Sequence, residues 1–291
     1  MNVAGYGLDV SHHQQAIDWK LVAEKGIKSM NNVPVNFAIL KCVYEAQSHR
    51  TDEFFERNYK GCKDNAINVG IYVYHASKSL ADPVSEANAV VRALNGRPLN
   101  VGIWHDLEDK SLQAAGNKAI HNLLAVEDAI FRQAGYDDIG IYCNKYWYDK
   151  VLDTEYLKKI YKYFWIARYL KNDVGVLPSE TMSPHKFAAA WQFSSKGKVW
   201  GINGNVDLDV DFIGLAAQMG FTSEAPKPTS GTTVSPGIHT VTVTNKLNVR
   251  KTPELGQNVI GQLPNGTMVN VTEISGKWAK IEGWVSTNYL K

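Results

Sequence analysis

The first 212 residues alternate between short apolar runs and longer segments in which apolar residues recur three and four positions apart. Short apolar runs predict strands that are buried on both faces, whereas the longer spacing predicts amphipathic helices. We expect five strands, each followed by a helix. The strands span 5–11, 36–43, 69–75, 101–108 and 139–144, and the helices lie near 17–25, 52–65, 82–95, 118–134 and 146–152.

The pattern changes after residue 144. Strand-like runs continue at 163–169, 188–193 and 206–210, but the segments between them are rich in glycine and proline and leave little room for long helices. Eight strands that are parallel or mostly parallel close naturally into a barrel. The predicted fold class is therefore α/β, with an irregular β/α barrel built from five β/α units and then three strands.

A second, smaller domain is expected at the C-terminal end. Residues 221–236 are rich in proline, serine, threonine and glycine and lack periodicity, which is typical of a flexible linker. Only short strand patterns follow, separated by turn signals such as Asn265-Gly266 and Ser275-Gly276. The predicted domains are a catalytic barrel at 1–220, a linker at 221–236 and a small all-β barrel at 237–291.

Composition excludes several classes of protein. The net charge of +2 is too small to indicate a nucleic-acid partner, and no apolar run approaches the roughly 18 residues of a membrane-spanning helix, so we expect no membrane insertion. The three cysteines, Cys42, Cys62 and Cys143, form no C-x-x-C pair and are interpreted as reduced, structural residues. Residues 237–291 hold six basic and three acidic side chains, which weakly favours an anionic polymer as partner.

Carboxylates recur where the predicted strands end. Asp9 ends the first strand, Asp106 and Glu108 end the fourth, and Asp207 lies in the eighth, which neighbours the first in a closed barrel. Asp106 and Glu108 are two residues apart, so their side chains are expected on one face of an extended strand, about 6.6 Å apart along the backbone. Carboxyl groups that lie close together raise one another's pKa, and burial raises it further. A glycosidase needs a carboxyl group that stays protonated near neutral pH, because this group protonates the leaving oxygen.

Aromatic residues accompany these acids. Such side chains are common in protein cores, and at least half of this set is expected to be ordinary packing. Stacking on sugar rings is the alternative interpretation for three of them, Tyr142, Tyr169 and Trp191. The full set is Tyr74, Tyr142, Trp165, Tyr169 and Trp191.

The motifs along the first 212 residues resemble those of family 25 glycoside hydrolases, the lysozymes of phages and bacteria. The opening Gly7-Leu-Asp-Val-Ser-His-His-Gln14, followed by Ile17-Asp-Trp19, resembles the start of that family. Further matches follow in the right order: Gly70-Ile-Tyr-Val-Tyr-His75, His105-Asp-Leu-Glu108, Gly140-Ile-Tyr142, Trp165-Ile-Ala-Arg-Tyr169, Trp191-Gln192 and Val206-Asp207.

This resemblance implies N-acetylmuramidase activity, which is hydrolysis of the β-1,4 bond between N-acetylmuramic acid and N-acetylglucosamine. It implies Glu108 as general acid/base, Asp106 as its partner, and Asp9 and Asp207 as supporting carboxylates. The expected substrate-binding residues are Tyr74, Tyr142, Trp165, Tyr169, Trp191 and Gln192. Substrate-assisted catalysis through the 2-acetamido group and inversion with a second acid as base both remain open. Lys41, Glu45 and Asp209 receive no role, because the spacing around Glu45 and Asp209 departs from the family pattern.

The C-terminal residues resemble bacterial SH3 domains, on the motifs Leu247-Asn-Val-Arg250, Pro253, Gly283-Trp284-Val285 and Tyr289-Leu290. Such domains commonly bind cell-wall peptides, so the expected partner is bacterial peptidoglycan. The N-terminal residues lack the basic start and apolar stretch of a signal peptide. We therefore expect the protein to accumulate in the host cytoplasm before its release to the cell wall, as in a phage endolysin.

No cofactor or metal is expected. Asp207-Leu-Asp-Val-Asp211 begins like a calcium loop, but Phe212 replaces the required glycine and Gln218 the bidentate glutamate. His12 and His13 are expected to end a strand, where adjacent side chains point in opposite directions, so they are interpreted as packing or solvent-facing residues.

Three other functions remain as alternatives. A Cys/His wall amidase or endopeptidase would need an accessible nucleophilic cysteine beside a histidine, and insensitivity to thiol alkylation would exclude it. A chitinase-type barrel shares the D-x-E ending but carries further aspartates upstream, where this chain has Val101 and Trp104. A non-catalytic wall lectin would not require the Asp106/Glu108 pair, and a turbidity assay on cell walls would identify it.

Overall fold

The structure is a computed structural model that describes residues 1–44, 50–219, 236–241, 243, 246–254, 258–264, 267–276, 278–281 and 284–286. The chain divides into two compact units, Met1–Ala225 and Pro226–Lys291. The expected linker at 221–236 lies outside the described residues except for its last position. Within the described part of the chain, no helix is both long and apolar enough to cross a membrane.

The first unit is built around a closed barrel of eight strands in sequential order. Neighbouring strands from β1 to β7 are parallel, whereas β8 pairs antiparallel with both β7 and β1. The expected barrel is confirmed, and β8 is its reversed strand. The strands are β1 (Gly5–Val10), β2 (Phe37–Lys41), β3 (Asn68–Tyr74), β4 (Ile103–Asp106), β5 (Ile139–Asn144), β6 (Tyr163–Ala167), β7 (Ala190–Gly197) and β8 (Val206–Asp211).

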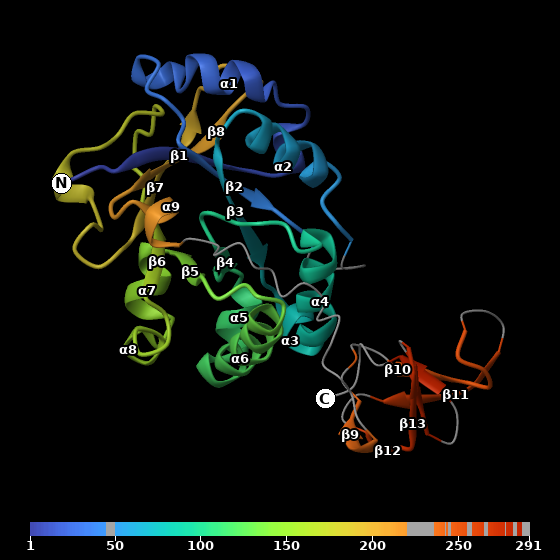
Figure 1. The fold of residues 1–291 in the computed structure, drawn as a ribbon. Coiled ribbons are helices and arrows are strands. Elements are labelled where there is room, and N and C mark those ends of the chain that lie inside the picture. The colour runs from blue at the N-terminus through green and yellow to red at the C-terminus, as the bar shows by residue number, and fades with distance from the viewer. Residues whose placement is uncertain are drawn as a thin grey trace. The chain divides into compact units, whose positions relative to one another are not determined.

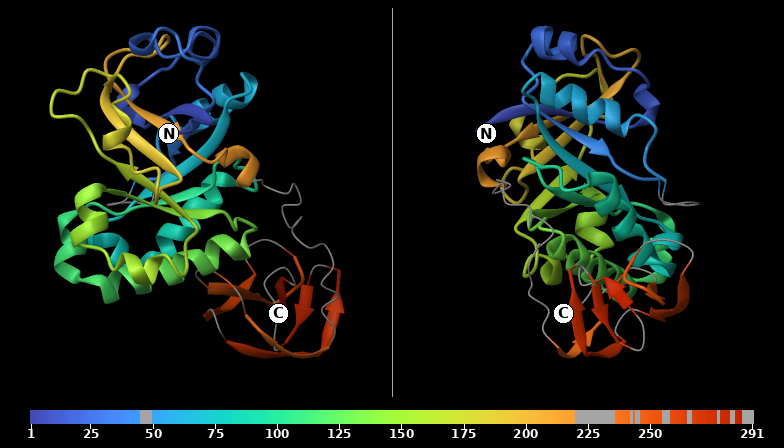
Figure 2. Two further views of the ribbon diagram at one scale, coloured as in Figure 1. Left: turned by 90° about the vertical axis from the view of Figure 1, so that its left-hand side faces the viewer. Right: turned by 45° about the vertical axis from the view of Figure 1, so that its right-hand side comes forward.

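Helices lie on the outside of the barrel and cover the strands (Figures 1 and 2). Asp82 caps α4, with its carboxylate accepting from the Ser85 N–H, and Pro83 occupies the first helical turn. The α-helices are α1 (Trp19–Lys25), α2 (Phe55–Asp64), α3 (Ser77–Ala81), α4 (Pro83–Leu94), α5 (Lys110–Ala115), α6 (Asn117–Gln133), α7 (Lys145–Lys150), α8 (Thr154–Leu157) and α9 (Leu215–Gln218). Three short 3-10 helices are η1 (His12–Gln14), η2 (Lys28–Met30) and η3 (Glu180–Met182).

Strand alternation divides the core into two layers. Trp104, Tyr142 and Trp165 pack together in one buried cluster, and their rings contact edge-on or tilted. The residues between them along the strands, such as Ile103 and Ile141, belong to the larger cluster that lies under the helices. Gly140 makes room for the Trp104 ring, because a Cβ at this position would lie 2.5 Å from that ring. This tight packing fixes β4 beside β5.

The regular elements in the described residues of the second unit are all β-strands, as predicted. A five-stranded sheet has the order β11-β10-β15-β14-β13, and β9 pairs with β12 in a two-stranded sheet. In this unit, β12 and β13 are separated by Thr272 and belong to different sheets. Its strands are β9 (Gly237–Thr240), β10 (Lys246–Arg250), β11 (Val259–Pro264), β12 (Met268–Val271), β13 (Glu273–Ser275), β14 (Trp278–Lys280) and β15 (Trp284–Ser286). The turn predicted at Ser275-Gly276 joins β13 to β14, whereas Asn265-Gly266 lies outside the described residues.

Candidate active site

Asp9 and Asp207 lie directly opposite each other in the β1–β8 pair. Asp9 is the fifth residue of β1, but Asp207 is only the second residue of β8. If β8 were parallel to β1, Asp207 would lie toward the other end of the barrel. The reversed direction of β8 brings its first residues to the end of the barrel where β1 finishes, and this is why the two carboxyl groups meet.

The fourth strand contributes the other two acids. Asp106 is the last residue of β4 and is buried, with Tyr74 of β3 and Tyr142 of β5 as its register neighbours. The backbone stays paired for one more residue, because the Leu107 N–H donates to the Tyr142 carbonyl at 2.9 Å. Leu107 is fully buried in the outer layer of the core. Glu108 follows as a half-buried residue.

Glu108 lies in the wall of a pocket of about 300 Å³. The pocket forms where β5 and β6 end, because its other residues come from the ends of these strands and the segments directly after them. They are Tyr142, Asn144, Lys145, Tyr146, Ala167, Arg168 and Tyr169. Asn144 also caps α7, and its side-chain oxygen accepts from the Trp147 N–H. A half-buried carboxyl group and three tyrosines therefore line a cavity that is large enough for part of a sugar chain.

Gln192 connects the acids to the tyrosines. Its Nε2 donates to Asp9 Oδ2 at 2.7 Å, and its Oε1 accepts from the Tyr142 hydroxyl at 2.8 Å and from the Tyr169 hydroxyl. The amide orientation is fixed by this network, since an amide N–H donates to a carboxylate and a tyrosine hydroxyl donates to an amide oxygen. Gln192 thus links β1, β5, β7 and the segment after β6 at the carboxyl end of the barrel.

Asp209 is a further carboxyl group of this cluster, and the sequence left its role open. It is fully buried, and its Oδ1 accepts from the Trp165 indole N–H at 2.8 Å. Trp165 itself is almost completely buried and contacts Tyr142 and Trp104. Trp165 therefore holds Asp209 from inside the barrel and has little surface left for a ligand.

Burial dominates the electrostatics of the site. It raises the pKa of Asp9 and of Asp209 well above the ordinary range, with the neighbouring Asp207 adding to both shifts. Burial, and then the nearby Glu108, raises the pKa of Asp207 to about 6. The pKa of Glu108 is raised by burial and by the charge of Asp109. The site therefore keeps protons on carboxyl groups at pH values at which exposed acids have lost them.

The aromatic residues divide into two groups. Tyr142 and Tyr169 line the pocket, and Tyr169 is 40% exposed. Trp191 has no exposed surface, and its indole N–H donates to the Arg168 carbonyl at 2.8 Å. The expectation of sugar stacking is therefore wrong for Trp191 in this structure. Because strand residues alternate, Gln192 points to the site and Trp191 points to the outer layer.

Two residues near the acids were missed by sequence reasoning. Asp109 caps α5, and its Oδ2 accepts from the Tyr74 hydroxyl at 2.8 Å, which draws Tyr74 toward β4. Tyr72 of β3 is close to Asp9 and Asp106, and burial raises the pKa of its hydroxyl well above the ordinary value. An N-cap signal before 110–115 could have identified Asp109.

Two residues at and after the end of β2 received no role from the sequence. The Lys41 ammonium lies over the Tyr44 and Tyr74 rings, and Glu45 lies outside the described residues.

Other sequence expectations have mixed outcomes. His12 and His13 do not point in opposite directions, because they form the 3-10 helix η1 and their ring centroids are 4.1 Å apart. The three cysteines are free and buried, as predicted, and burial raises the pKa of each thiol. A thiolate nucleophile is therefore disfavoured. The calcium-loop interpretation is also excluded, since residues 207–211 form β8.

A group of three residues that could hold a metal ion lies outside the pocket. His75, His105 and Glu127 are all buried, and their ligand atoms lie within 4.8 Å of one another. Sequence reasoning missed the group because the three residues belong to separate elements and share no short motif. The cluster lies on the outer side of β4, since His105 alternates with the inward-facing Trp104 and Asp106.

A closed β/α barrel with buried carboxyl groups around a half-buried glutamate defines the protein as a glycosidase. The sequence profile of "Glycosyl hydrolases family 25" matches residues 8–202, and that of "Bacterial SH3 domain" matches residues 245–291. Because the first match covers more than half of the chain, this protein belongs to glycosyl hydrolases family 25.

Individual relatives agree with this assignment. The chain is 26% identical over 224 residues to Lysozyme M1 of Streptomyces globisporus, covering 73% of this chain and 69% of that one. It is 27% identical over 207 residues to protein YegX of Escherichia coli O157:H7, covering 70% and 68% of the two chains. The solved catalytic domain of endolysin ply40 from bacteriophage P40 of Listeria monocytogenes shares the fold, with a TM-score of 0.57, 22% identity and coverage of 75% of this chain and 97% of that one.

Proposed function

We propose that this protein hydrolyses the β-1,4 bond between N-acetylmuramic acid and N-acetylglucosamine in bacterial peptidoglycan. The observation that carries the proposal is the position of Glu108. Its half-buried carboxyl group lines the pocket beside Tyr142 and Tyr169, two residues after the buried Asp106 and close enough to Asp207 to raise the pKa of that group. The similarity to Lysozyme M1 supports the same substrate class.

In the proposed reaction, Glu108 acts first as an acid. Its raised pKa keeps the carboxyl group protonated, and the proton passes to the glycosidic oxygen as the bond to the anomeric carbon breaks. The acetamido oxygen of the same sugar attacks that carbon, while Asp106 accepts a hydrogen bond from the acetamido N–H. Water then attacks the anomeric carbon and displaces the acetamido oxygen, and the Glu108 carboxylate takes the proton of the water. The product keeps the configuration of the substrate.

Asp9 is a poor base for the competing inverting reaction. A base must be ionised, but burial raises the pKa of Asp9, and its Oδ2 is already held by the Gln192 amide. We assign Asp9 the task of holding Gln192, and through it the tyrosines of the pocket, and Asp209 the task of holding Trp165. Asp207 is the register partner of Asp9 and supports it. Gln192, Tyr142, Tyr169 and Tyr74 are the proposed contacts to the sugar chain.

The second unit has a separate proposed task. Its match to bacterial SH3 domains and its six basic against three acidic residues over 237–291 support binding to peptidoglycan. Attachment to the wall raises the local concentration of the barrel at its substrate, without a contribution to the chemical step.

The Glu108→Gln variant tests the proposed role of Glu108. The amide keeps the size of the side chain but has no acidic proton, so the lysis rate on cell walls should fall by about 10²–10⁴-fold. The matched control is Glu155→Gln on α8, where the exposed carboxylate pairs with Lys158 and should be dispensable. Retention of more than about a tenth of the wild-type rate by Glu108→Gln, with an unchanged circular dichroism spectrum, contradicts the assignment.

A further inference from the structure

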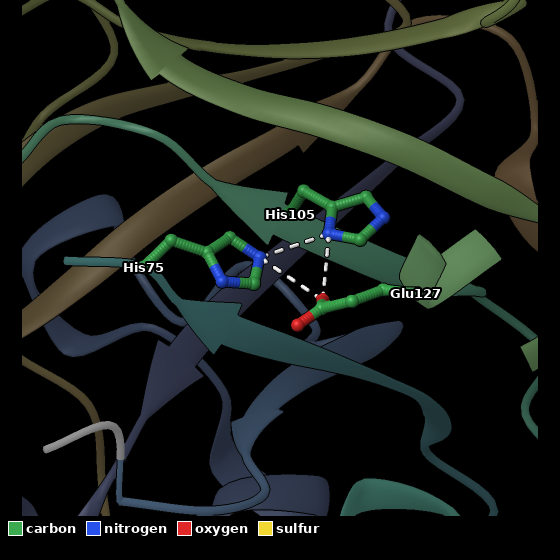
Figure 3. A group of neighbouring side chains, drawn as sticks. All are labelled: His75, His105 and Glu127. Carbon is green, nitrogen blue, oxygen red and sulfur yellow. Dashed lines mark hydrogen bonds and ion pairs between the residues drawn. The ribbon is translucent and has the colours of Figure 1, made fainter. Parts of the chain in front are cut away.

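A second polar cluster lies outside the barrel wall, away from the pocket. His75 follows β3, His105 belongs to β4, and Glu127 belongs to α6, and all three side chains have no exposed surface. Figure 3 shows the two imidazole rings and the Glu127 carboxyl group pointing toward one another. The proposed hydrolysis uses none of these residues.

The spacing of three atoms in this cluster fits a small cation. His75 Nε2 and His105 Nδ1 are 2.9 Å apart, and Glu127 Oε2 lies 3.6 Å and 3.5 Å from them. A point that is equidistant from these three atoms lies about 2.0 Å from each, which matches zinc–nitrogen and zinc–oxygen bond lengths of about 2.0–2.2 Å. The triangle is therefore of the size that zinc ligands form.

The outer nitrogen of each ring meets a carboxylate. His75 Nδ1 is 3.1 Å from Glu86 Oε2, and His105 Nε2 is 2.9 Å from Asp128 Oδ1. The Tyr161 hydroxyl donates to the other oxygen of Asp128 at 2.9 Å. Metal-binding histidines almost always donate their second ring N–H to a carboxylate or carbonyl group in this way, because it fixes the tautomer and the ring orientation.

This arrangement determines where the ring protons lie. A carboxylate only accepts hydrogen bonds, so each imidazole carries its proton on the outer nitrogen. The inner nitrogens of His75 and His105 then present two lone pairs to each other. Among the described residues, the oxygens of Glu127 have no partner that meets hydrogen-bond geometry, and the carboxyl group lies beside that of Glu86. Three acceptors that converge in a buried space repel one another unless a proton or a cation lies between them, and the distances given above fit the cation.

We propose that His75 Nε2, His105 Nδ1 and Glu127 bind a structural Zn²⁺ ion. Two imidazoles and a carboxylate are ligands that suit zinc, and the second oxygen of Glu127 or a water molecule supplies the fourth position. Charge also balances: Zn²⁺ and Arg132, which lies 3.7 Å from Asp128, offset the carboxylates of Glu86, Glu127 and Asp128. The ion ties α6 to the outer face of β3 and β4, directly behind Asp106.

Metal analysis of the full-length protein tests this inference. Purified from zinc-containing medium, the protein should hold about one Zn²⁺ per chain. After removal of the metal with a chelator, added Zn²⁺ at a hundredfold excess over its Kd should raise the Tm of the barrel by at least ~5 °C. Cobalt(II) titration of the metal-free protein should give the visible absorption bands of a tetrahedral site, with saturation at about one ion.

Two variants assign the ion to this cluster. Glu127→Gln should lower zinc affinity by more than tenfold, whereas His121→Gln on the same helix, where the ring stacks on Tyr156, should leave it unchanged. Less than ~0.1 Zn²⁺ per chain together with a Tm that does not respond to zinc overturns the inference, and so does equal zinc affinity of the two variants. If Glu127→Gln fails to fold, the wild-type stoichiometry and the cobalt spectrum decide the question.

Discussion

Asp9 of β1 lies directly opposite Asp207 of β8, so two carboxyl groups share one register position in the wall of the barrel. Burial and the neighbouring Asp207 raise the pKa of Asp9 well above its ordinary range, and burial with the nearby Glu108 raises that of Asp207 to about 6. Such a pair costs folding free energy whenever both groups are ionised. Because the pair lies at the carboxyl end of the barrel, where barrel enzymes have their active sites, we infer that it is retained for function despite this loss of folding free energy.

Replacement of Asp207 by asparagine should stabilise the protein at neutral pH. When folding raises the pKa of a carboxyl group, the folded protein loses stability as the pH rises from the unfolded pKa to the folded pKa. For Asp207 this range runs from about 4 to about 6. Asparagine has no charge to bury, so Asp207→Asn should raise the free energy of unfolding by about 1–3 kcal/mol at pH 7. Near pH 4 the gain should vanish, because the wild-type carboxyl group is then protonated in the folded state.

Thermal unfolding of the barrel at pH 4 and pH 7 measures this difference. The same gain at both pH values would show that the effect is unrelated to ionisation. The lysis rate of Asp207→Asn should fall even as the Tm rises. Asp207 lies opposite Asp9, and Asp9 holds the Gln192 side chain, so the substitution also disturbs Gln192.

The pH dependence of the rate should report Glu108. As the acid, it must be protonated, so kcat/KM should fall as pH rises through its raised pKa. Asp109 contributes to that shift, and asparagine is an equally good helix cap. Asp109→Asn should therefore move the alkaline limb of the profile to lower pH on a soluble oligosaccharide. A limb that stays in place or moves to higher pH contradicts the role of Glu108 as the acid.

Removal of the second unit should separate wall binding from hydrolysis. A truncated protein that ends at residue 220 holds every proposed catalytic group and should cut soluble muropeptide oligomers at nearly the full-length rate. On intact cells it should act more slowly, because it lacks the second unit that holds it at the wall. The segment 237–291 alone should bind cell walls without lysing them, and more weakly as salt rises. Equal rates on cells, with no binding by the isolated segment, would reduce this unit to a spacer.

Much of the fold could be predicted from the sequence because the signals are local. Buried strands followed by amphipathic helices specify the barrel, and barrel closure alone brings Asp9 near β8. The direction of β8 cannot be predicted from local sequence, because the apolar pattern of a six-residue strand is the same for parallel and antiparallel pairing. Only its pairing with β7 and β1 decides where Asp207 lies. The motif Trp191-Gln192 likewise predicts that this strand contributes to the site. It does not show which of the two residues faces the site.

The buried histidine cluster shows the limit more clearly. His75 and His105 are 30 residues apart, and Glu127 is a further 22 residues along the chain. Each residue alone is an ordinary core or helix position. Only the packing of α4 and α6 against β3 and β4 brings them together, so no spacing rule could have found them.

The products released from purified peptidoglycan test the proposed activity most directly. Mass spectrometry of the digest, after reduction with borohydride, identifies the sugar that carries the new reducing end. Cleavage by Glu108 at the proposed bond predicts new reducing ends on N-acetylmuramic acid, no new free amino groups, and no products from Glu108→Gln. Reducing ends on N-acetylglucosamine, or new amino groups without new reducing ends, would contradict it.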